Sequence, residues 1–372
     1  QKRLMNKTSK TALLFLICCL FANTVSGRIC QALVLEAGGD KGSYEAGVLD
    51  ILINNATNPD NVKWDIVAGV SAGAINSGYI SQFKIGDEVN MVKNLVGLWS
   101  QITSADIYKS WSGGMVQGIL FESSVFDESP AVDFLKQHIT LPPQRPIRLS
   151  ATDANTGTYI TFDENLTAEE LAIVMKSSGA VPVVFPYVNF RNYTFMDGGV
   201  INCLNIGAAI NACRDLVESD KDIYVDVVLD DYTAALPLVN ADDDTAFSIL
   251  SRAYSIMAYY NSISLLTEAE QEFPNINFRY VVAPSQELPT ATLPLGFKHD
   301  EILQMIAIGQ KDGLAAIQKG PGVSYKEFMA KAKAQLKTLR RSAQKAAATI
   351  MQDKIKEEAK MIYAKQLKGL EL

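Results

Sequence analysis

Short apolar segments alternate with stretches of helical periodicity through most of the chain. Apolar runs at 32–36 and 65–68 are each followed by a sharp turn and a helical pattern, which begins at Ser43 after the first and at Ala72 after the second. Later apolar runs of strand length lie at 147–151, 159–162, 223–229 and 278–283. This alternation predicts an α/β fold in which a mainly parallel sheet, joined by right-handed crossovers, lies between helices in three layers.

Three long helical patterns follow in the second half of the chain. Those at 240–267 and 298–318 are predicted to pack around the sheet, and the Ala- and Lys-rich stretch 325–372 predicts a long helix at the C-terminus. This last stretch holds 12 Lys or Arg and 5 Asp or Glu, so it carries +7 while the rest of the chain carries −14. Three roles are open for such a basic helix: lying on anionic lipid, covering an apolar groove of its own protein, or packing with its lysines turned to solvent.

The N-terminus has the layout of a secretory signal peptide. A basic segment at 1–10 precedes an apolar run at 11–22, and small residues end the segment at Gly27. The apolar run is short for a transmembrane helix, which needs about 20 apolar residues. We therefore expect residues 1–27 to be a signal peptide; a buried helix or an uncleaved anchor is the alternative.

Composition limits the partners of the protein. A chain of 372 residues, of which 48% are hydrophobic, can bury a substantial core, and a net charge of −7 argues against nucleic acid as a partner. Once residues 1–27 are removed, the odd number of cysteines that remains cannot form a complete disulfide framework: Cys30, Cys203 and Cys213.

The pentapeptide from Gly69 to Gly73 has the form G-x-S-x-G. Small residues in this pattern let a strand turn sharply into a helix and expose the hydroxyl of the central residue, here Ser71. Ser71 would then lie at a helix N-terminus, where free N–H groups stabilise developing negative charge. The pattern predicts a serine nucleophile at a strand end, where open α/β sheets bind ligands.

A glycine-rich turn, Ala37–Gly42, connects the first predicted strand to its helix. Backbone N–H groups in such a turn converge on an anion, and for a serine nucleophile the relevant anion is the tetrahedral oxyanion. The same geometry cradles phosphates in other proteins, but the turn lacks the glycine spacing of a P-loop or of a dinucleotide fold. The sequence therefore favours an oxyanion hole.

The nucleophile also needs a base within hydrogen-bond reach. Asp197 ends an apolar strand and is followed by Gly198 and Gly199. The chain has only two histidines, and neither His138, at the end of a helical pattern, nor His299, at the start of a later one, lies in a motif. This shortage favours a Ser-Asp dyad over a triad.

In this order, the three motifs resemble those of the patatin-like phospholipases, whose pattern is G-G-G-x-[RK]-G, then G-x-S-x-G, then D-G-[GA]. Similar context occurs at 149–157 and 178–186, and the resemblance covers about residues 32–209. It departs at Ala37, which stands where the family has its first glycine. Because this position lies at a strand end and a methyl group is small, we expect activity to survive.

The resemblance implies roles for individual residues. Ser71 and Asp197 would be catalytic, and the backbone N–H groups of Gly38, Gly39 and Asp40 would hold the oxyanion. The remaining members of the oxyanion loop are Lys41, the basic position of the family, and Gly42; the residues that support the motifs are Gly69, Gly73, Gly198 and Gly199. The catalytic domain would span 30–320, followed by a basic amphipathic helical extension at 321–372. No cofactor or metal is implied, and the acidic run at 242–244 lacks the spacing of a calcium loop.

The implied activity is lipid acyl hydrolysis, of phospholipase A or lysophospholipase type, on glycerolipid or phospholipid at a membrane or micelle surface that the protein binds peripherally. Two alternatives remain: a lipid-binding protein of the same fold with weak or no activity, and an esterase that acts on soluble esters. A carboxylate base with a pKa near 4 predicts activity retained near pH 5. The signal peptide then predicts a secreted protein, or one in the lumen of an acidic, lysosome-like vacuole.

The segment 98–134 changes character, with large apolar side chains scattered among Gly and Ser: Trp99, Tyr108, Trp111, Met115, Ile119, Leu120, Phe121 and Phe126. They would line an acyl-chain channel or enter a lipid interface, or else cap the core. The sequence does not distinguish these roles, because it does not show which side chains are exposed.

Overall fold

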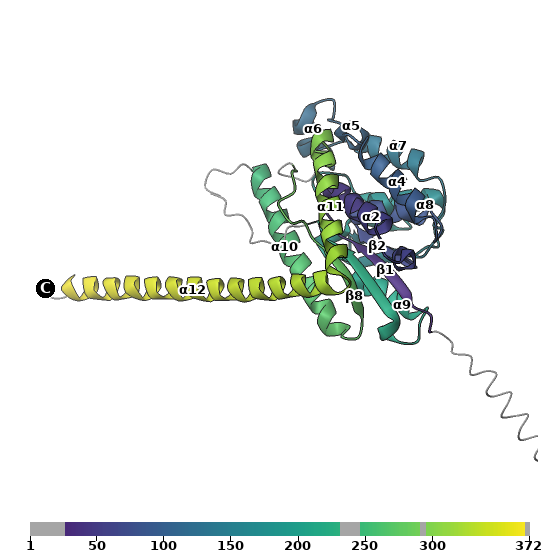
Figure 1. Ribbon diagram of the computed structural model, residues 1–372. Coiled ribbons are helices and arrows are strands. Elements are labelled where there is room, and N and C mark those ends of the chain that lie inside the picture. The colour runs from purple at the N-terminus through teal and green to yellow at the C-terminus, as the bar shows by residue number, and fades with distance from the viewer. Residues whose placement is uncertain (1–26, 231–245, 291–294, 369–372) are drawn as a thin grey trace, which may run out of the picture.

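The computed structural model describes residues 27–230, 246–290 and 295–368. One eight-stranded sheet crosses the molecule, and helices cover both of its faces (Figure 1). The predicted α/β architecture, with a mainly parallel sheet between helices and a long C-terminal helix, is therefore confirmed.

The strands of the sheet are ordered β5-β6-β3-β2-β1-β7-β8, with β4 paired to β3. Neighbours from β3 through β8 in this order run parallel, whereas β4 and β6 each pair antiparallel with β3 and β5 pairs antiparallel with β6. The strands are β1 Cys30–Leu35, β2 Ile66–Val70, β3 Ile147–Asp153, β4 Tyr159–Phe162, β5 Val188–Phe190, β6 Tyr193–Asp197, β7 Ile223–Val228 and β8 Asn277–Val282. The predicted strands lie within about two residues of these bounds; the short strand β5 was not predicted.

The helices are α2 Gly42–Asn54, α3 Ala72–Ser81, α4 Glu88–Trp99, α5 Ser104–Ile107, α6 Gly114–Phe121, α7 Ser129–His138, α8 Ala168–Ser178, α9 Ile206–Arg214, α10 Ala246–Glu272, α11 His299–Lys319 and α12 Val323–Lys368. The prediction of long helices at 240–267 and 298–318 corresponds to α10 and α11. The first residues of the former range, and the acidic run 242–244, lie outside the described residues.

Alternate residues of the strands pack into two cores. In β1, Leu33 and Leu35 face a core built with α2, α3, α4 and α11, whereas Ala32 and Val34 face a second core built with α9, α10 and the start of α12. Because both faces are covered, the central strands are apolar on both sides, as parallel strands in α/β proteins usually are.

A disulfide joins Cys30 of β1 to Cys213 of α9, and Cys203 is a buried thiol. Residues 1–26 of the predicted signal peptide lie outside the described residues. Among the helices of the described part, none is both long enough and apolar enough to span a membrane.

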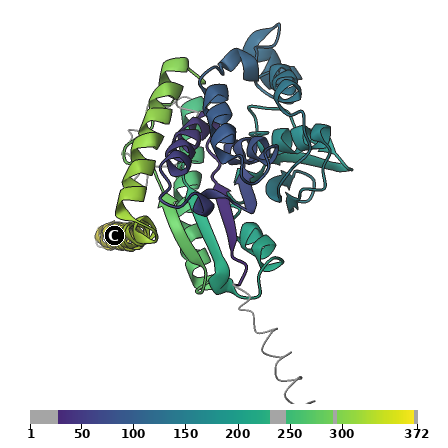
Figure 2. The same cartoon turned by 45° about the vertical axis from the view of Figure 1, so that its right-hand side comes forward.

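The helix α12 leaves the body of the molecule. Its first turns are anchored by Phe328, Met329 and Ala332, which are buried in the second core. From Arg341 to Met361 every residue is exposed, and the helix projects away from the sheet (Figures 1 and 2). Over this length α12 covers no groove of its own protein.

Candidate active site

Ser71 lies in a sharp turn between β2 and α3. Its backbone has φ 52° and ψ −118°, a conformation that L residues rarely adopt and that is typical of a nucleophile elbow. The flanking glycines permit this turn: a Cβ on Gly69 would lie 2.1 Å from the carbonyl oxygen of Gly73, and one on Gly73 would lie 2.3 Å from that of Leu35. The G-x-S-x-G spacing thus allows α3 to start directly against β1 and β2.

Strand β3 brings Asp197 to this turn. Val70, the last residue of β2, pairs with Ser150, and Asp197, the last residue of β6, pairs with the next residue, Ala151. Gly198 then lies against Val70, because a Cβ there would be 2.8 Å from the Val70 Cγ1 atom. Two segments more than a hundred residues apart therefore end side by side.

Asp197 is buried beside Ser71. Its Oδ1 accepts a 2.7 Å hydrogen bond from the backbone N–H of Gly199. Burial raises the pKa of Asp197 from 3.8 to about 6, against the lowering effects of the nearby Ser71 side chain and of the Gly199 N–H. A serine beside a carboxylate with a raised pKa has the arrangement expected of a nucleophile and its general base.

Two residues that were not assigned a role from the sequence hold this geometry. The backbone N–H of Ser71 donates to Oγ of Ser178 (2.8 Å), whose hydroxyl donates to the carbonyl of Ser150 (2.6 Å). The side-chain amide of Asn205 donates to Oγ of Ser150 (2.7 Å). Ser178 opens the segment 178–186 that resembles the patatin-like family, so a signal for it was present; Asn205 lies in no motif.

The glycine-rich turn lies beside the N-terminus of α3. The N–H of Gly73 donates to the carbonyl of Glu36, which ties the turn to the elbow (3.0 Å). Gly39 has φ 63°, which favours glycine. Ala72 directly follows Ser71. In such elbows the residue after the serine usually supplies an oxyanion donor, a role that was not predicted for Ala72 from the sequence.

The side chain of Asp40 anchors the turn to a distant loop. Its buried carboxylate accepts hydrogen bonds from the Thr290 hydroxyl (2.7 Å) and from the backbone N–H groups of Gly296 (3.0 Å) and Phe297 (3.3 Å). Burial raises its pKa, while these bonds and the nearby Lys41 lower it. Gly42 completes the turn against Trp99, since a Cβ there would be 2.7 Å from the indole ring.

Buried acidic side chains lie beneath the turn. Glu45 of α2 accepts hydrogen bonds from the backbone N–H of Glu36 (2.8 Å) and from the Asn76 amide (2.7 Å). Burial, and then the neighbouring Asp230 carboxylate, raise the pKa of Glu45 well above its usual value. The raised pKa favours the neutral form of Glu45, which reduces the negative charge beside the turn.

The two histidines do not take part in this arrangement. His138 ends α7, where its ring packs on Phe134 with a centroid distance of 4.4 Å and burial lowers its pKa. His299 begins α11. Neither ring is among the groups that shift the pKa of Asp197.

The aromatic residues of segment 98–134 divide into two groups. Trp99 is buried in the core, where its indole N–H donates to Asn76 (2.8 Å) and its ring stacks on Phe297. Tyr108 and Phe126 pack together with a centroid distance of 4.6 Å. These side chains cap the core, whereas the apolar side chains of α6 are exposed.

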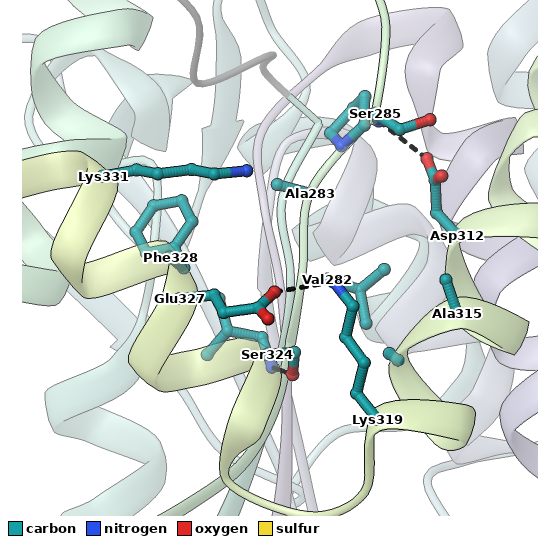
Figure 3. A pocket seen from close by; sticks show the side chains of 13 residues that line it. Val282, Ala283, Ser285, Asp312, Ala315, Lys319, Ser324, Glu327, Phe328 and Lys331 are labelled. Atoms are coloured by element: carbon teal, nitrogen blue, oxygen red, sulfur yellow. Dashed lines mark hydrogen bonds and ion pairs between the residues drawn. The ribbon is translucent and has the colours of Figure 1, made fainter.

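A hollow of about 230 Å³ lies between the end of β8, α11 and the start of α12. Figure 3 shows Lys319 and Glu327 paired across it and the N–H of Ser285 donating to Asp312. None of the predicted site residues lines this hollow. In the described ranges of the chain, no three His, Cys, Asp or Glu side chains form a group that would hold a metal ion.

Comparison with known proteins identifies part of the chain. The profile described as patatin-like phospholipase matches residues 33–210. No curated protein matches the chain. Among solved structures, the chain is similar to VipD from Legionella pneumophila, with 11% sequence identity, a TM-score of 0.35, and coverage of 79% of this chain and 67% of that one.

Proposed function

We propose that this chain, whose residues 33–210 match the patatin-like phospholipase family of lipid acyl hydrolases, cleaves the ester bonds of glycerolipids with a Ser71–Asp197 dyad. The observation that carries the proposal is the position of the buried Asp197 carboxylate beside the Ser71 side chain. It pairs a weak nucleophile with a base of suitable pKa at the end of two strands.

In the first half-reaction, Oγ of Ser71 bonds to the ester carbonyl carbon while Asp197 accepts the hydroxyl proton. The carbonyl oxygen becomes an oxyanion, which accepts hydrogen bonds from the backbone N–H groups of Gly38, Gly39 and Ala72 in this proposal; one such donor is typically worth about 3 to 4 kcal/mol of barrier. The carbon–oxygen bond to the alcohol then breaks, the alcohol takes the proton from Asp197, and an acyl-Ser71 ester remains.

In the second half-reaction, Asp197 accepts a proton from water as its oxygen attacks the acyl-Ser71 carbonyl. The same N–H groups stabilise the second oxyanion. The bond to Oγ breaks, Ser71 recovers its proton from Asp197, and a fatty acid leaves. Lys41, half-buried in the same turn, is suited to attract the phosphate of a phospholipid.

We further propose that the protein works in the secretory pathway or outside the cell. The disulfide between Cys30 and Cys213 is typical of oxidising compartments and supports this assignment. A pKa of about 6 for Asp197 favours compartments near or above that pH, because at pH 5 only about one tenth of the base is ionised. It therefore disfavours the acidic vacuole that the sequence suggested.

The test is release of fatty acid from mixed phospholipid vesicles, without added calcium, by the mature chain beside Ser71→Ala and Asp197→Asn. Loss of release in both variants is the expected result. If the unsubstituted chain binds vesicles but releases nothing, it is a lipid-binding protein of this fold. Equal turnover of dispersed and aggregated substrate would instead identify an esterase for soluble esters.

A further inference from the structure

Helix α6 exposes an unusual concentration of apolar side chains. Five of its eight residues have large apolar side chains that are 49–79% exposed: Met115, Val116, Ile119, Leu120 and Phe121. The one buried residue of α6 is Gly118, which lies against the backbone of 124–125. A large exposed apolar patch on the surface of a protein usually marks an interaction site.

The helix is mounted firmly on the body. The indole N–H of Trp111 donates to the carbonyl of Ser124 (3.0 Å), and Lys109 and Asp127 form a short antiparallel bridge at the base of the segment. The N–H of Val125 donates to the carbonyl of Val183 (2.8 Å). Fixed in this way, the helix presents its apolar side chains in one place.

These contacts connect α6 to the catalytic residues. Val183 is itself 55% exposed, and it lies five residues after Ser178, which holds the backbone of Ser71. Between them, the carbonyl of Ala180 accepts a hydrogen bond from the N–H of Asp197 (2.9 Å). In Figure 1, α6 lies at the top of the molecule.

We propose that α6 inserts into a glycerolipid surface and docks the protein with its catalytic residues facing that surface, which deepens the function proposed above and rests on it. The charge of the segment identifies the occupant. Residues 110–121 contain no Asp, Glu, Lys or Arg, so the helix enters an apolar layer without desolvating a charge. Without basic residues, attraction to anionic lipid plays no part, and a zwitterionic surface is sufficient.

Charge distinguishes α6 from the other exposed helix, α12. The projecting part of α12 carries Lys and Arg, so binding through α12 would require anionic lipid and weaken in salt. Binding through α6 is expected to occur on vesicles of phosphatidylcholine alone and to be unchanged between 0.1 and 0.5 M salt.

Tryptophan fluorescence reports directly on the contact of α6 with lipid. Of the three in the chain, Trp64 and Trp99 are buried and only Trp111, at the base of α6, is partly exposed. Brominated phosphatidylcholine should therefore quench the fluorescence of Trp111 selectively. The measurement uses the Ser71→Ala chain, so that the lipid remains intact.

The decisive variant combines Leu120→Ser and Phe121→Ser in the Ser71→Ala chain. We expect its partition onto phosphatidylcholine vesicles to fall at least about tenfold, with loss of the quenching, because two large apolar side chains no longer leave water. Val89→Ser is the matched control: Val89 is 62% exposed on α4, and its replacement should change neither signal. Unchanged binding of the double variant would overturn the proposal, as would self-association through α6, detected by sedimentation, without vesicle binding.

Activity measurements distinguish the docking role of α6 from the proposed hydrolysis of esters, on which it rests. With Ser71 intact, the double variant should hydrolyse a soluble ester such as p-nitrophenyl butyrate at the normal rate and phosphatidylcholine vesicles at least about tenfold more slowly, in step with its binding. If the normal chain hydrolyses neither substrate, the proposed function fails, and the binding measurements still decide the role of α6. Equal losses on both substrates would overturn the docking role.

Discussion

The carboxylate of Asp197 lies beside the side chain of Ser71 and is buried deeply enough for its pKa to rise to about 6. Only the ionised carboxylate accepts the serine proton. We therefore expect kcat/KM on a soluble ester to fall tenfold per pH unit on the acid side, with half of its plateau value at about pH 6. This replaces the expectation from the sequence that activity persists near pH 5, which assumed an unperturbed carboxylate.

The histidines provide the control for this profile. His138→Gln and His299→Gln should leave its midpoint unchanged, since neither histidine is among the groups that shift the pKa of Asp197. A midpoint that moves in either variant would implicate that histidine as the base. Full activity down to pH 4.5 would contradict the burial of Asp197.

The same burial makes Asp197 costly to the fold. Its pKa is about 6 in the folded chain against an ordinary value of 3.8, so the folded state disfavours the charged form above pH 6 by roughly 3 kcal/mol. Asp197→Asn removes the charge and keeps an oxygen that accepts from the N–H of Gly199. We expect this inactive variant to unfold at higher urea than the normal chain at pH 8.

The pH dependence of this stability difference provides the control. Below pH 3.8 Asp197 is protonated in both the folded and the unfolded chain, so the advantage of the variant should be largest above pH 6 and decline as pH falls from 6 to 4. Urea midpoints at pH 8 and pH 4 test this. A variant less stable than the normal chain at pH 8 would show that the ionised carboxylate stabilises the fold.

The glycine-rich turn distinguishes two neighbouring positions. A Cβ on Gly38 would lie 2.0 Å from Oδ2 of Asp230, whereas Ala37 already carries a methyl group and donates its N–H to the carbonyl of Cys203 (3.1 Å). Gly38→Ala should displace the oxyanion donors and lower kcat by about 10² to 10³. Ala37→Gly should change kcat less than about threefold.

Near-ultraviolet circular dichroism of both variants shows whether the fold survives. A Gly38→Ala chain that is folded and fully active would remove this turn from the oxyanion hole. A large gain on Ala37→Gly would show instead that the alanine, where the patatin-like family has glycine, impairs this chain.

Local sequence was sufficient to predict the sheet and the sharp turn at Ser71. A short apolar run before a glycine-flanked Ser71 specifies both a strand and the turn that ends it, because each depends on residues close in sequence. The carboxylate partner, the glycine-rich turn and the D-G-G segment were likewise found by motif. The perturbed pKa of Asp197 was not, since it comes from burial by segments distant in sequence.

Long-range contacts explain the other omissions. Asn205 reaches Ser150 from 55 positions away, and Asp40 holds Thr290 from 250 away, so no spacing rule predicts either. The exposure of α6 was also hidden, because its composition suits a buried helix equally well. Only packing shows that it faces solvent.

A buried ion pair between the neighbouring strands β7 and β8 predicts a large effect on stability without a catalytic role. Asp226 of β7 accepts hydrogen bonds from Nε of Arg279 (3.0 Å) and from the indole N–H of Trp64 (2.8 Å), and both charged side chains are almost completely buried. Asp226→Ala leaves a buried guanidinium without its counter-charge and should cost about 3 to 5 kcal/mol of unfolding free energy. Asp220→Ala removes an exposed partner of Arg214 and should cost less than about 1 kcal/mol. Urea unfolding at pH 7.5 measures both, and similar losses in the two variants would show that the buried pair is not the stabilising one.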